Sequence, residues 1–188
     1  MSEFIRDGEH YSLDLTIDEA HILINLVEQL LELLGEGDFH HHYDESDPFA
    51  QLMSQLKAAP DEIVTPQDPV LLRLLPNAYT DPEAAADFRR FTEPTLRGNK
   101  QRILRKVRED LTQMVDHEES GVVEDIEGEV WLLAMNDLRL ALSVRLGITE
   151  ESFERFEALP DSDPQKSIYA VYFWLGWLQE NLLALLTS

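Results

Sequence analysis

Residues 168–186 constrain the fold most, because this segment is apolar on nearly every side of a helix. Its apolar positions are Val171, Trp174, Leu175, Leu178, Leu182 and Leu185. Gln179, Glu180 and Asn181 interrupt the run, and a membrane helix would bury these polar groups in lipid at a cost of several kcal/mol. The segment therefore predicts a buried helix of a non-membrane protein, opened by Asp163 and Pro164, in the middle of a helical bundle.

Other segments repeat apolar residues at helical spacing and contain residues that typically begin or end a helix. Thr16 and Glu19 form a capping box before an apolar run that Gly35 ends. Residues 123–146 form the clearest core helix, which Gly147 ends, and Thr149 caps a short helix to about residue 158. The expected core positions in 123–146 are Ile126, Trp131, Leu133, Leu138, Leu142, Val144 and Leu146.

Two Asp-Pro pairs mark helix starts between residues 68 and 92. Asp68 before Pro69 and Asp81 before Pro82 each read as an N-cap followed by a proline in the first turn, where the missing N–H costs nothing. We expect short helices from Pro69 and Pro82, and a separate helix from Thr92 to about residue 115. The apolar face of this last helix is Leu96, Ile103, Val107, Leu111 and Met114.

The N-terminus predicts a β-hairpin. Tyr11, Leu13 and Leu15 alternate with polar residues, and Asp7-Gly8 suits a type I′ turn. The predicted fold class is therefore mainly α: a single-domain helical bundle over residues 1–188 with a short N-terminal β-hairpin at 1–15. Residues 36–47 and 58–68 are expected loops, with a short helix at 48–57.

Composition excludes several classes of function. The chain has no cysteine, which removes disulfides, thiolate nucleophiles and thiol redox sensing. No nucleotide-binding or hydrolase motif is present, so we expect no cofactor and no enzyme. The first residues lack the basic and apolar regions of a signal peptide, and the expected location is the cytoplasm.

Charge is distributed very unevenly. Residues 89–108, called here the basic segment, hold eight of the 15 basic residues and one acid, so they carry a formal +7. The whole chain carries −22, which leaves −29 on the remainder. The basic segment must therefore face acids of the same chain, an acidic partner or an anion. The expected internal acids are Glu124, Asp125, Glu127 and Glu129.

Two groups of motifs are similar to those of a known family. The first is DPVLLRLLPNAY at 68–79 with ADFRRF at 86–91; the second is WLLAMNDLRLAL at 131–142 with YAVY at 169–172 and WLGWLQ at 174–179. Their order and spacing resemble an actinobacterial domain-of-unknown-function family, number 2017, over nearly the whole chain. The resemblance implies a helical cytoplasmic protein and brings no catalytic residues. Some family members are described as transcriptional regulators, and their genes often lie near that of the Clp-protease adaptor.

These observations favour a non-enzymatic regulatory or adaptor-like protein that binds a protein partner through residues 73–108. The candidate contact residues are Arg73, Asn77, Tyr79, Arg89, Arg90, Arg97, Lys100 and Arg105. Residues 71–79 form either an exposed apolar docking strip or part of the core. The tryptophan-rich C-terminal helix closes either a core or a homodimer seam.

Two alternatives remain open. Helices from Pro82 and Thr92 with a turn between them sketch a DNA-binding helix-turn-helix, although the net charge disfavours nucleic acid. His40, His41 and His42 lie among acids and are weak candidates for a metal site. Separately, Asn136, Asp137 and Arg139 interrupt an apolar helix, which predicts a structural polar network in which Asp137 accepts from an arginine or a backbone N–H.

Overall fold

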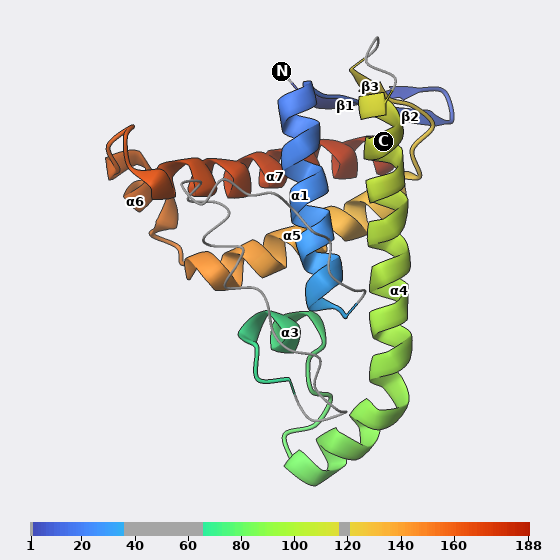
Figure 1. Cartoon of the computed structure of the whole chain (residues 1–188), viewed down its shortest axis with the longest axis vertical. Coiled ribbons are helices and arrows are strands. Elements are labelled where there is room, and N and C mark those ends of the chain that lie inside the picture. Colours follow the sequence, from blue (N-terminus) through green and yellow to red (C-terminus); the bar gives the residue numbers. More distant parts are fainter. Residues whose placement is uncertain (1, 36–65, 117–120) are drawn as a thin grey trace.

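The computed structural model describes residues 2–35, 66–116 and 121–188, and it confirms a mainly α-helical fold with a small N-terminal sheet. Figure 1 shows α1 and α4 running along the long axis while α5 and α7 cross them. The predicted segments at 36–47 and 48–57, and most of 58–68, lie outside the described residues. None of the helices in the described part combines the length and the apolarity needed to cross a membrane.

The predicted hairpin is present, with one more strand than expected. β1 (Glu3–Asp7) pairs antiparallel with β2 (His10–Asp14), and β2 pairs with β3 (Val122–Val123). The pairing of Asp7 with His10 leaves Gly8 and Glu9 as the loop. Gly8 has a φ of +65°, and Glu9 has no positive φ. The Asp7-Gly8 type I′ turn was therefore wrong, because a positive φ at the first loop residue alone is typical of type II′.

Local signals place α1 and α3 as predicted. α1 (Ile17–Leu33) has the full capping box: Glu19 N–H donates to the Thr16 hydroxyl at 3.2 Å, and Thr16 N–H donates to the Glu19 carboxylate at 2.8 Å. Gly35 follows α1 with a φ of +85°. α3 (Pro69–Leu74) begins after Asp68, whose carboxylate accepts from Val70 N–H at 2.7 Å. These contacts satisfy orphan donors of the first turns.

The two helices expected at 82–115 are one. α4 (Pro82–Asp116) runs for 35 residues with Pro94 inside it, and its ribbon bends in the N-terminal part (Figure 1). The Thr92 hydroxyl donates to Phe88 C=O at 2.9 Å, as in a helix interior, and caps nothing. Pro94 has no N–H for the Arg90 carbonyl, and its ring crowds that carbonyl, so the helix bends and then continues.

The centre of the bundle is α5 (Gly128–Leu146), which packs against α1, α3, α4 and α7. It begins later than predicted because Val122 and Val123 pair with β2 instead. Trp131 is fully buried, its indole N–H donates to Asp110 at 2.9 Å, and its ring meets Phe4 edge-on at 5.9 Å. Leu133, expected in the core, is 51% exposed.

α7 (Pro164–Leu186) lies against α5 and β1, at the side of the bundle and not in its middle as predicted. Its N-cap is Asp163, as expected, and Trp174 and Trp177 pack half-buried against the core. α6 (Ser152–Ala158) precedes it, with Glu151 in place of Thr149 at the N-cap. Arg6 donates to Leu185 C=O at 3.1 Å and to Ser188 C=O at 3.2 Å, which ties the hairpin to the end of α7.

The buried Asp110 carboxylate gives the first test. It accepts from the Trp131 indole and pairs with Lys106 at 2.7 Å. We expect Asp110→Ala to lower the free energy of unfolding by about 1–3 kcal/mol, because a buried N–H loses its acceptor. Asp110→Asn should cost less, since its amide oxygen still accepts from the indole. Urea denaturation measures both, with the exposed Asp116→Ala as control; equal losses for the two Asp110 variants would contradict this account.

Candidate functional site

Arg89, a predicted contact residue, is buried, with 5% of its surface exposed. Its guanidinium donates to Leu75 C=O at 3.0 Å and to the Asn77 side-chain oxygen at 2.5 Å, and it pairs with Glu93. Arg89 therefore holds the segment that follows α3 against α4. Arg89 and Asn77 have a structural role here, and a partner could reach the guanidinium only by opening this contact.

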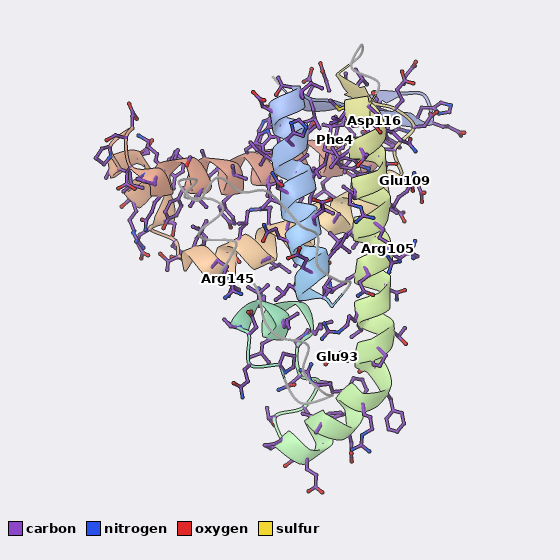
Figure 2. All side chains as sticks on the ribbon, viewed as in Figure 1. Phe4, Glu93, Arg105, Glu109, Asp116 and Arg145 are labelled. Atoms are coloured by element: carbon purple, nitrogen blue, oxygen red, sulfur yellow. The ribbon has the colours of Figure 1, made fainter. Side chains whose placement is uncertain are left out.

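Glu93 is shared by two arginines that lie on opposite sides of Pro94. Arg89 pairs with it from the preceding turn, and Arg97 from the following turn at 2.6 Å. Figure 2 shows Glu93 on the N-terminal part of α4. Burial raises the pKa of Glu93, but the hydrogen bonds and positive charges of Arg97 and Arg89 outweigh this effect, so the pKa lies below the ordinary 4.5.

Lys100, also a predicted contact residue, pairs with Asp137 at 2.7 and 2.9 Å. The prediction that Asp137 is paired and structural agrees with this contact, but the donor is a lysine of α4 and not an arginine or a backbone N–H. Burial raises the pKa of Asp137, while the hydrogen bond and charge of Lys100 and the Asn136 side chain oppose that rise. The pair joins α4 to α5.

Arg139 makes a separate link, to α7. Its guanidinium donates to Gln179 at 2.6 Å and lies over the Tyr172 ring at 5.4 Å. A Cβ built on Gly176 would lie 3.2 Å from the same guanidinium, so the glycine makes room for it. Asn136, Asp137 and Arg139 therefore form two connections, one to α4 and one to α7.

Of the acids predicted to face the basic segment, Glu127 helps through its charge to raise the pKa of Lys106, while four basic side chains of the segment pair with other acids. Arg89, Arg97, Lys100 and Lys106 pair with Glu93, Asp137 and Asp110. Asp125, one of the predicted acids, instead pairs with His10 at 2.7 Å. At least these four of the eight basic side chains in the segment are thus engaged inside the molecule.

The remaining predicted contact residues lie at the surface. Arg73 is exposed on α3, Arg105 is exposed on α4 (Figure 2), and Arg90 is exposed with a 3.4 Å contact to Asp87. Tyr79 is 52% exposed and packs edge-on against Phe88 at 5.5 Å. Of the two alternatives for residues 71–79, the core holds for Leu71, Leu74 and Leu75, which are buried.

An exposed apolar group on α4 was missed. Phe88 is 42% exposed, Phe91 is 79% exposed, and Leu96, predicted for the core, is 45% exposed. The available signal was the spacing of Phe88 and Phe91, which places both rings off the buried face at Ile103, Val107 and Leu111. We call the exposed set the α4 surface: Tyr79, Phe88, Arg90, Phe91, Leu96 and Arg102.

The other candidate sites give weaker support for a function. A hollow between α4 and residues 75–78 has a volume of about 10 Å³, which is room for one water molecule and not for a substrate. His40, His41 and His42 lie outside the described residues, and within the described ranges no three histidine or acidic side chains gather as metal ligands. The helix-turn-helix is corrected, because α4 continues through Thr92 without a turn.

Comparisons with known proteins agree on one family. The model of the family described as "Domain of unknown function (DUF2017)" matches residues 1–186, as the resemblance implied. The oxidative stress regulator AosR of Mycobacterium tuberculosis is 31% identical over 192 residues, covering 96% of this chain and 84% of that protein. A Mycobacterium leprae protein named for the same regulator is 34% identical over 194 residues, covering 97% and 85%. No solved structure matches the chain.

The pairing of Glu93 makes the free energy of unfolding depend on pH in the acidic range. Its folded pKa is lowered, so its stabilisation is complete above about pH 4.5 and is lost as the pH falls further. We expect Glu93→Gln to cost about 3 kcal/mol at neutral pH, because the buried Arg89 and the half-buried Arg97 lose their carboxylate. The difference from the wild type should shrink below about pH 4.5. Urea midpoints across this pH range measure it, and Glu109→Gln, exposed on the same helix, is the control.

The Lys100–Asp137 pair gives a second pH-dependent prediction, for a carboxyl group whose pKa is raised and not lowered. Lys100→Met leaves Asp137 buried and unpaired, which should cost about 3–5 kcal/mol at neutral pH. The folded pKa of Asp137 is already raised and would rise further, so the deficit should shrink as the pH falls through it and the carboxyl becomes neutral. The double variant with Asp137→Leu should recover most of the loss. A deficit that does not change with pH would contradict the role of the buried charge.

Proposed function

The chain belongs to the DUF2017 family, and from this membership together with the α4 surface we propose that the protein is a non-enzymatic regulator that binds another protein. The names of the mycobacterial relatives support a regulatory role. The proposed binding site is the α4 surface. It keeps, from the region 73–108 that the sequence suggested, side chains that are exposed to solvent.

The exposure of Phe91 carries this proposal. A phenylalanine left mostly in water costs roughly 1.5–3 kcal/mol relative to burial, and burial against a partner would recover that free energy. Phe88 and Tyr79 enlarge the apolar area, and aromatic and arginine side chains are enriched where partners bind most strongly. Arg90 and Arg102 supply the positive charge beside it.

Three of the predicted contact residues are not part of the proposed binding site, because their charges are paired within the fold. Arg89, Arg97 and Lys100 hold their carboxylates inside the molecule, so replacing them would test folding before binding. Arg105 and Arg73 remain exposed candidates at the edges of the region. Because the chain has no cysteine, a response to oxidants would not pass through a thiol of this protein.

Partner capture tests the proposal. We expect Phe91→Ser to lose at least tenfold of the captured partner, equivalent to 1.4 kcal/mol of binding free energy, because it removes the most exposed ring. The matched control is Leu133→Ser on α5, which replaces another exposed apolar residue. Circular dichroism and urea midpoints establish that both variants fold. Full retention of every partner by Phe91→Ser would overturn the proposed site.

A further inference from the structure

Five exposed residues recur at a regular spacing along α4, two before the bend at Pro94 and three after it. Phe88, Phe91, Thr95, Gly98 and Arg102 are separated by three, four, three and four positions, and each is exposed. This spacing averages 3.5 residues and gives the seam along which one helix packs on another. We call these five residues the α4 stripe; its N-terminal part is aromatic and its C-terminal end is cationic.

Gly98 lies inside the stripe and leaves space for a second backbone. A Cβ built on this residue would meet nothing within 4 Å. A glycine in an exposed helix costs about 1 kcal/mol relative to alanine, and its use here fits the close approach of another helix. From its N-terminal to its C-terminal end, the stripe thus presents two aromatic rings, a small residue that allows a close approach, and an arginine.

Arg102 indicates the charge of the occupant. Among the described residues it has no carboxylate partner, unlike Arg97 and Lys100 on the same helix. Arg90 flanks the stripe and is only weakly paired, at 3.4 Å. The C-terminal end of the stripe therefore favours carboxylates on the bound helix.

A second copy of α4 fits poorly. Two such helices packed along their stripes would bring two basic segments together, and like charges in contact oppose binding. The acids elsewhere in the chain do not prevent an acidic helix from binding here. Exposed charges are screened over about 8 Å at physiological salt, and Figure 1 shows the N-terminal part of α4 extending beyond α1, α5 and α7.

We infer that the α4 stripe binds an acidic amphipathic helix of a partner protein. Its apolar residues would cover Phe88 and Phe91, and its flanking carboxylates would pair with Arg102 and Arg90. This inference rests on the proposed function and adds the chemical class of the partner.

A designed peptide tests the class of partner. The probe is a fluorescent helix with leucine and phenylalanine at heptad positions and glutamate on both flanks, titrated with the full chain and followed by anisotropy. We expect binding that weakens at least tenfold with Phe91→Ser and with Arg102→Glu, and that is unchanged with Leu133→Ser. The same peptide with lysine in place of glutamate should bind at least tenfold more weakly.

Three results would overturn the inference. The first is equal binding of the glutamate and lysine peptides, and the second is no effect of either stripe variant on binding. The third is tighter binding of a peptide with the sequence of residues 148–163 of this chain, because a second copy of the chain would then be the occupant of the stripe. If the designed peptide fails while partner capture still depends on Phe91, the acidic-helix class is wrong and the protein-binding function stands. If neither measurement depends on Phe91, both proposals fail.

Discussion

The shared pairing of Glu93 with Arg89 and Arg97 is the interaction on which the shape of α4 depends. Pro94 removes a backbone hydrogen bond at this point, and the two arginines bridge the gap with side-chain contacts from the turns before and after it. Arg89 also holds residues 75–77. The same carboxylate therefore supports the proline bend and the contact between α4 and the segment after α3.

The ion pairs also decide which charges are available for recognition. Lys100 and Lys106 neutralise buried carboxylates that join α4 to α5 and to Trp131, so their charge is used within the fold. Arg90 and Arg102 remain at the surface. Formal charge along the sequence therefore overstates the positive charge that the surface of α4 presents.

Features set by neighbours in sequence could be predicted, and those set by distant residues could not. The caps at Thr16, Asp68 and Asp163 were predicted because each bond spans two or three residues. The continuity of α4 was missed, since it depends on pairs across Pro94 that compete with a plausible turn. The Lys100–Asp137 pair joins residues 37 positions apart, so it has no local signal in the sequence.

The contact of Arg6 with the last carbonyls of α7 has a practical consequence. It brings the hairpin and Ser188 together at the end of the molecule opposite the N-terminal part of α4 (Figure 1). A fluorophore or surface-attachment tag added at residue 188 would therefore emerge far from the aromatic rings of α4. Immobilisation through that point would orient every molecule with the N-terminal part of α4 toward the solution.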